Sequence, residues 1–481
     1  MKNLLYFVFL THFISYGQLT VRIDSVSTLN KIALSNTQYS NQTITLSEFI
    51  GYIKKFHPIV KQANLIVLDS DLKRLKAKGV FDPKLELDYT TKQFQSKEYY
   101  EKLNATFKIP VWYGIDFKAN YENNQGLYLN PENSTPSDGL FAFGITASIG
   151  NGMLINTRMA AIKQAENFQK QALEERKILV NTILFNAANS YFDWLQDYKE
   201  MKIHKSFLSN ADMQFNAVKR SFKAGEVAAI DTLEANITLI NRKLNLEKAS
   251  IELSKSALQL SNFLWLENNI PVELQKGIIP DILTINTVDL SLQTPNLTID
   301  SIVYKEHPKL KSLEYKIENL KIDRKLKNNQ LLPKIEAQYN FITESSSLEP
   351  NLNSENFKAG LKVSIPVFLR KERADVRLTK LKIEAVNYEK MTQRVMITNK
   401  INALKKELIS YEKQLGHLNL LVKDYKTLSD AEFRKFNLGE SSVFYVNIRE
   451  SKLIQAELKY VALINTYLKT KAKLFNSLVV Y

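Results

Sequence analysis

Few residues of this chain have the types and spacing that chemistry needs. His57 and His307 each stand directly before a proline, an arrangement that fits either a metal or proton-relay role or the start of a helix. No group of His, Asp and Glu has the spacing of a zinc site, so we interpret both histidines as helix-start residues duplicated with a repeat. The chain has no cysteine, which excludes disulfides, thiol catalysis and cysteine-bound metals.

Catalytic motifs are also missing from the sequence. There is no Gly-rich phosphate loop and no nucleophile elbow, so we expect no catalytic residue, no metal, no cofactor and no enzyme activity. One acidic pair does stand out, because Asp231 and Glu234 are three residues apart and share one face of a predicted helix. They are either ordinary surface charges or groups that face a pore, where carboxylates favour cations.

The composition and the N-terminus indicate a folded, exported protein. Of 481 residues, 44% are hydrophobic, which argues against disorder, and the net charge of +15 is spread along helical segments rather than gathered in a nucleic-acid-binding run. Lys2, the apolar stretch 4–14 and the small residues Ser15 and Gly17 predict a signal peptide cleaved before Gln18. No other apolar stretch approaches the length of a transmembrane helix, so any membrane insertion must use strands.

The elements that position these residues are two long helical hairpins. Residues 153–224 and 226–270 contain neither glycine nor proline, and the stretches on both sides of Gly439 are almost as free of them. A helix of about 70 residues is about 100 Å long. Glycine after a helix adopts a positive φ at low cost, so we predict that Gly225 and Gly439 form the tips of the hairpins.

The chain contains one unit twice. Three matched pairs share a spacing of 250 residues, whereas the two tip glycines are 214 apart, so the first copy carries 36 additional residues within about 100–140. This insertion could add strands, an extracellular loop or a periplasmic elaboration. The three matched pairs are His57 and His307, Pro83 and Pro333, and Tyr89 and Tyr339.

These spacings divide the chain into five parts. We expect Ser47 to cap the first helix of the first repeat. Strands are expected at about 84–149 and 334–367, followed by hairpins at 153–266 and 371–480. The five parts are a signal peptide at 1–17, an N-terminal extension at 18–45, a first repeat at 46–266, a linker at 267–297 and a second repeat at 298–481.

The strands have the alternation of a sheet with one apolar face. Leu85, Leu87 and Tyr89 alternate with polar neighbours, and the segments near 103–109, 115–121 and 141–149 do the same. Four to six strands cannot close a barrel, and open strand edges are not viable in lipid. Copies of the chain must therefore pool their strands, and a trimer would hold twelve, or eighteen if the insertion joins. The predicted fold class is mainly α with transmembrane β.

The order and duplication of these motifs resemble the TolC family of outer-membrane efflux proteins. The resemblance covers about 45–480 and rests on the repeat, the two tips and the strand-to-helix junction from Ser364 to Phe368. It implies a homotrimer with a β-barrel in outer-membrane lipid and an α-helical tunnel in the periplasm. It also implies two partners, a periplasmic adaptor (membrane-fusion) protein and an inner-membrane pump. The chain would then be the passive exit duct of a tripartite efflux or secretion system.

The resemblance further implies which residues meet the adaptor. In the family the glycine-bearing turn lies in the adaptor contact, and some members narrow at an acidic ring just inside the tip. Asp231 and Glu234 are the candidates for such a constriction, although Tyr445 and Ile448 at the corresponding positions of the second repeat are not acidic. The candidate docking residues are Arg220, Ala224, Gly225, Glu226, Arg434, Leu438, Gly439 and Glu440.

One alternative of a different class stays open at this point. A periplasmic coiled-coil scaffold without a pore, similar to adaptor hairpins, would explain the long helices. It would not explain the alternating strands.

Overall fold

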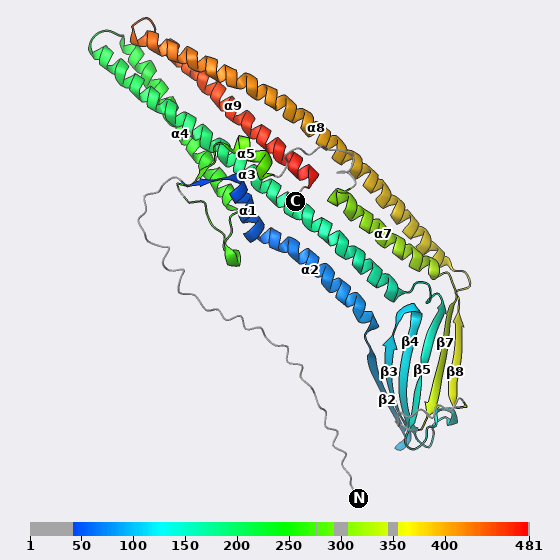
Figure 1. Ribbon diagram of the computed structural model, residues 1–481. Coiled ribbons are helices and arrows are strands. Elements are labelled where there is room, and N and C mark those ends of the chain that lie inside the picture. The colour runs from blue at the N-terminus through cyan, green and yellow to red at the C-terminus, as the bar shows by residue number, and fades with distance from the viewer. Residues whose placement is uncertain (1–41, 276, 293–305, 345–354, 480–481) are drawn as a thin grey trace.

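The computed structural model describes residues 42–275, 277–292, 306–344 and 355–479 (Figure 1). The predicted signal peptide at 1–17, and the extension as far as residue 41, lie outside the described residues. Helices run side by side along one long axis, and a single sheet forms one end of the molecule. Among the described residues, no helix is both long enough and apolar enough to cross a membrane.

Two long helices form the axis of the molecule, and each ends beside a tip glycine. The helix α3 spans Thr157–Lys223 and α8 spans Arg370–Asn437, with 67 and 68 residues. Both return helices are shorter, with α4 at Ala229–Ser261 and α9 at Val443–Leu478. The other α-helices of the described residues are α1 at Leu46–Phe56, α2 at Pro58–Lys78, α5 at Thr284–Ser291 and α7 at Pro308–Asn329.

The sheet has six strands in the order β2-β3-β4-β5-β7-β8, and every neighbouring pair is antiparallel. The first repeat supplies four strands and the second supplies two. The insertion therefore adds strands to the sheet. The strands are β2 at Lys84–Phe94, β3 at Lys97–Pro110, β4 at Ile115–Gln125, β5 at Leu140–Gly150, β7 at Lys334–Thr343 and β8 at Phe357–Ser364.

The helices make a layer that is open at both edges. Toward the tips α4 packs on α3, α3 on α9, and α9 on α8; toward the sheet the order is α2, α3, α7 and α8. One edge is therefore formed by α4 and α2, and the other by α8. The sheet has the same pair of open edges, since β2 follows α2 and β8 leads into α8.

A core at mid-length joins the two repeats and the linker between them. Tyr191 on α3 is buried, and its hydroxyl donates to the carbonyl of Ile44 at 2.7 Å and accepts from the backbone N–H of Asp281 at 3.1 Å. Burial raises the pKa of Tyr191 to about 12, so the phenol stays neutral. It thereby holds two short strands that pair in parallel, β1 at Thr43–Ile44 and β6 at Ile279–Pro280.

The mainly α fold class with an attached sheet is confirmed. The expected cap of the first helix is wrong by two residues, because Thr45 rather than Ser47 is the N-cap of α1. The Thr45 hydroxyl accepts from the N–H of Glu48 at 3.2 Å, and the Glu48 carboxylate accepts from the N–H of Thr45 at 2.9 Å. This reciprocal pair satisfies two backbone donors, which Ser47 inside the helix cannot do.

Candidate functional site: the two tips and the sheet

Both tips make the same hydrogen-bonded turn. Gly225 has φ of 79° and Gly439 has φ of 78°, the left-handed region in which glycine has no steric cost. At the first tip the N–H of Gly225 donates to Phe222 at 3.0 Å and that of Glu226 to Ser221 at 2.9 Å. The second tip repeats both bonds at the same lengths, so each turn satisfies the last carbonyls of its long helix.

The two tips lie together at the end of the molecule farthest from the sheet (Figure 1). A small apolar cluster joins them, formed by Val218 on α3, Ala235 on α4 and Val443 on α9 with Phe436 packed against it. The residues at the turns themselves are exposed. Leu438 has 74% of its surface exposed, and Arg220 and Arg434 are also exposed in the last turns of α3 and α8. The expected docking residues are thus gathered on one open surface.

The acidic pair of the first repeat lies just behind its tip. The Asp231 carboxylate accepts from the backbone N–H of Ala228 at 3.2 Å, which caps the start of α4. The Glu234 carboxylate accepts from the side-chain amide of Asn447 on α9 at 3.4 Å. Both carboxylates therefore have a local structural partner, and a pore-facing role for them stays a proposal.

A buried charge pair links the two hairpins, and sequence reasoning missed it. Arg242 on α4 and Glu450 on α9 are 9% and 4% exposed, and their closest charged atoms are 3.9 Å apart. Gln214 on α3 donates to Glu450 at 3.3 Å. Burial raises the pKa of Glu450, and Arg242 partly opposes that shift. The signal available in the sequence was a charged residue at a helix position where the neighbouring turns have apolar residues. Only the packing of the three helices shows that the two charged residues meet.

The duplicated histidines begin helices, as expected from the prolines after them. His57 is the N-cap of α2 and His307 the N-cap of α7, and each Nδ1 accepts a backbone N–H two residues later, at 3.1 Å and 3.2 Å. The Nε2 of His307 lies 3.1 Å from the carbonyl of Ser477. Within the described parts of the chain, no three His, Asp or Glu side chains are grouped as a metal site would require.

The strand register divides the sheet into an apolar and a polar face. One row across all six strands reads Leu85, Phe107, Ala119, Phe143, Phe341 and Phe357. The adjacent row on the other face reads Lys84, Lys108, Lys118, Gly144, Asn340 and Lys358. Many members of the apolar face are exposed in the single chain, among them Leu85, Leu361 and Val363. An exposed apolar face opposite a charged face is the pattern of a transmembrane barrel sheet.

A family model and several solved structures match this chain. Residues 115–264 match the model of the outer membrane efflux proteins, which are channel proteins. No curated protein sequence matches the chain.

Three solved structures illustrate the likeness of fold. The CmeC outer membrane channel of Campylobacter jejuni matches at 12% identity over 93% of this chain and 90% of that chain, with a TM-score of 0.63. CusC, which forms a transmembrane channel, matches at 13% identity over 93% and 95%, with a TM-score of 0.65. The open MtrE outer membrane channel of Neisseria gonorrhoeae matches at 11% identity over 93% of each chain, with a TM-score of 0.63. At these identities the likeness shows the fold.

Proposed function

We propose that three copies of the chain form a passive exit duct, because residues 115–264 match the model of the outer membrane efflux proteins and the fold is that of solved outer membrane channels. The pooled strands close a barrel in the outer membrane, and the helices line a tunnel that continues into the periplasm. An inner-membrane pump supplies the energy, and a periplasmic adaptor protein connects that pump to the tips. The chain itself converts no substrate.

The sheet is the single observation that carries this proposal. Its apolar face is exposed along all six strands, and its opposite face holds lysines and carboxylates. Its edge strands β2 and β8 have unpaired backbone groups on their outer sides. When neighbouring copies pair edge to edge in lipid, the backbone groups of both edge strands find partners and the apolar face contacts lipid. The barrel then has no free edge, and its charged face encloses water.

The helical edges support the same ring of copies. Along α4 a stripe of exposed apolar residues recurs every seven positions, the period of a helix that packs lengthwise on another. On α8, at the opposite edge, Leu421 and Leu428 are exposed with the same spacing at the level of α4, and Leu381, Tyr388 and Val395 are exposed with it at the level of α2. The edge formed by α4 and α2 in one copy can thus pack against the α8 edge of the next copy. This is the head-to-tail contact that closes a ring. The α4 stripe consists of Ile230, Ile237, Leu244, Ile251 and Leu258.

The tips are the proposed docking surface for the adaptor. They lie farthest from the sheet, they expose Leu438, and each presents a basic residue before the turn and a glutamate after it. A partner that inserts an apolar side chain beside Leu438 and places carboxylates near Arg220 and Arg434 would complement this surface. The proposed contact residues are the eight named from the sequence.

Two adjacent residues of β2 allow a matched test of the duct. Leu87 belongs to the apolar face and Asp88 to the polar face. We expect Leu87→Lys to impair trimer assembly in lipid, because a lysine on the lipid face of a barrel costs about 2–4 kcal/mol near mid-membrane. Asp88→Lys should assemble normally. The measurements are trimer yield in liposomes and single-channel conductance in planar bilayers.

The outcome separates the duct from the pore-less scaffold. A wild-type chain that extracts without detergent as a monomer and gives no conductance would overturn the duct. Equal assembly of the two lysine variants would show that the apolar face does not meet lipid. Conductance that survives in Asp88→Lys and is lost in Leu87→Lys supports the proposal.

A further inference from the structure

The strands β3 and β4 are the insertion that distinguishes the first repeat. β2 and β7 begin 250 residues apart, at Lys84 and Lys334, which is the spacing of the repeat. β5 and β8 correspond in another way, because each leads into a long helix. In the second repeat β7 and β8 pair directly with each other. In the first repeat β3 and β4 lie between the corresponding strands, β2 and β5.

The inserted hairpin is paired into the sheet over most of its length. β2 and β3 pair from Lys84 opposite Lys108 to Phe94 opposite Lys97, and β3 pairs with β4 over ten residue pairs. β4 then pairs with β5 from Ile115 opposite Ala147 onward. The hairpin is therefore interior to the sheet, and its removal would place β2 beside β5 as β7 stands beside β8.

The inserted strands also keep the division into two faces. Phe107, Ile109 and Phe117 continue the apolar face, and each of them is exposed in the single chain. Lys102, Lys108 and Lys118 lie on the polar face. Because a slip of one residue would exchange the faces, this agreement indicates that the hairpin is matched to the same bilayer as its neighbours.

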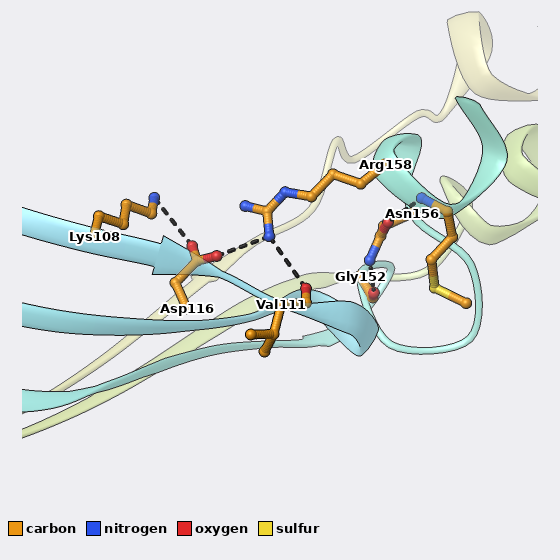
Figure 2. Close-up of polar contacts among 7 residues, drawn as sticks. Lys108, Val111, Asp116, Gly152, Asn156 and Arg158 are labelled. Atoms are coloured by element: carbon orange, nitrogen blue, oxygen red, sulfur yellow. Dashed lines mark hydrogen bonds and ion pairs between the residues drawn. The ribbon is translucent and has the colours of Figure 1, made fainter. Parts of the chain in front are cut away.

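An ion-pair cluster fixes the hairpin to the helices (Figure 2). Asp116, at the start of β4, is 8% exposed and has Arg158 of α3 at 2.8 Å from one oxygen and Lys108 of β3 at 3.0 Å from the other. Arg158 also donates to the carbonyl of Val111 in the turn between the two strands, at 3.4 Å. The turn is thereby held at the first turn of α3.

A glycine allows this turn to approach the helix start closely. Gly114 has φ of 71°, and a Cβ at this position would lie 2.9 Å from the carbonyl oxygen of Gly152. Asn156 beside it caps α3 by accepting from the N–H of Met159 at 2.9 Å and donates to Gly152 at 3.1 Å. The helix-side end of the hairpin is therefore built into the junction of sheet and tunnel, which a peripheral flap would not require.

We propose that this hairpin gives the trimeric duct of the preceding subsection, on which the inference rests, a barrel of eighteen strands in place of twelve. The edge strands β2 and β8 run in opposite directions, so copies can close the ring by antiparallel pairing. Barrel diameter grows roughly linearly with strand number, so the barrel is about 1.5 times as wide. The cargo class that fits such a lumen is a hydrophilic solute of polymer size, too wide for a twelve-stranded barrel.

The absence of cysteine makes a direct width measurement possible. Ala359→Cys, on the apolar face of β8 where the side chain is exposed, carries one spin label per copy. Electron–electron double resonance in lipid then reports the distance between copies, which we expect to be about 30 Å for eighteen strands and about 20 Å for twelve. Deletion of residues 97–125 supplies the twelve-stranded comparison. A label on Ala403→Cys, at an exposed position of α8, should give the same distance in both chains.

Each outcome decides the inference. A distance near 30 Å at Ala359 in the full chain supports eighteen strands even if the deletion variant fails to assemble. A distance near 20 Å in the full chain would mean that the hairpin leaves the barrel, and the inference falls while the duct stands. No distance between copies at either label would overturn the trimeric duct and this inference with it.

The cargo class has its own measurement. Polyethylene glycols of increasing size are added on the side of a planar bilayer opposite the helices, where the barrel opens. The largest polymer that still lowers conductance is recorded. We expect this limit to fall when residues 97–125 are deleted. Equal limits in the two chains would overturn the assignment of polymer-sized cargo.

Discussion

The two repeats are nearly identical at their tips and unequal at their strands. Gly225 and Gly439 have φ values one degree apart and make the same pair of hydrogen bonds, after helices of 67 and 68 residues. At the other end the first repeat has four strands and the second has two. Helix lengths must match because both hairpins span the same distance, whereas an antiparallel sheet accepts an additional hairpin without moving its neighbours out of register. The strand end of the repeat could therefore vary while the tip end stayed fixed.

The largest expected effect comes from the pair that holds the two hairpins together. Arg242→Met leaves Glu450 buried without its charged partner, and removing one partner of a buried pair costs about 3 kcal/mol. The double variant Arg242→Met with Glu450→Gln should recover most of that loss, since neither charge is then buried. Thermal unfolding of the reconstituted protein measures both. Equal destabilisation of the single and double variants would contradict a coupled pair.

The same carboxyl gives a pH dependence with a definite sign. Burial raises the pKa of Glu450 above 4.5, so the folded chain takes up its proton more readily than the unfolded chain. Its contribution to stability is therefore complete below pH 4.5 and is lost as pH rises through the raised pKa. Glu450→Gln should remove this component of a plot of unfolding temperature against pH. An unchanged plot would contradict the assignment.

Symmetry of the tips predicts equal effects from the two glycines. A Cβ at Gly225 or Gly439 would meet nothing within 4 Å, so the cost of a side chain is backbone strain alone. We expect Gly225→Val and Gly439→Val each to lose about 1–2 kcal/mol and to weaken adaptor crosslinking, while Gly→Asn at either site is milder. Barrel insertion should not change. Unchanged crosslinking and unchanged efflux in both variants would count against the docking surface.

A smaller effect is expected at the two histidine caps. Burial lowers the pKa of His57 and of His307 from 6.5, so the folded chain keeps both imidazoles neutral. Their contribution is complete above pH 6.5 and is lost as pH falls through the lowered pKa, because a protonated Nδ1 cannot accept the capping N–H. His307→Asn keeps a cap that does not titrate. Its unfolding temperature should therefore fall less than that of wild type between pH 7 and pH 5.

The smallest expected effect concerns the acidic pair behind one tip. If Asp231 and Glu234 face the pore, Asp231→Asn with Glu234→Gln should lower cation preference modestly, because part of the constriction charge is removed. Tyr445→Phe at the corresponding position of the second repeat is the matched control and should change nothing. Reversal potentials across a salt gradient measure this. A shift in the control as large as in the double variant would remove the pair from the proposed constriction.

Sequence patterns determined the features that depend on nearby residues. The tips followed from single glycines after long runs without glycine or proline, because a left-handed residue ends a helix by bonds within six residues. The helix starts at His57 and His307 followed from the prolines beside them. The two faces of the strands followed from alternation, and comparing spacings of 250 and 214 showed where residues were inserted.

Only the tertiary structure decided the features that join distant residues. The insertion could have been a loop or a periplasmic elaboration until the register placed β3 and β4 between β2 and β5. Arg242 meets Glu450 across 208 positions, and Arg158 meets Asp116 across 42. Alternation and glycine placement act through local backbone geometry, which each segment carries with it. The pairing of edges and the burial of charges depend on which segments the fold brings side by side.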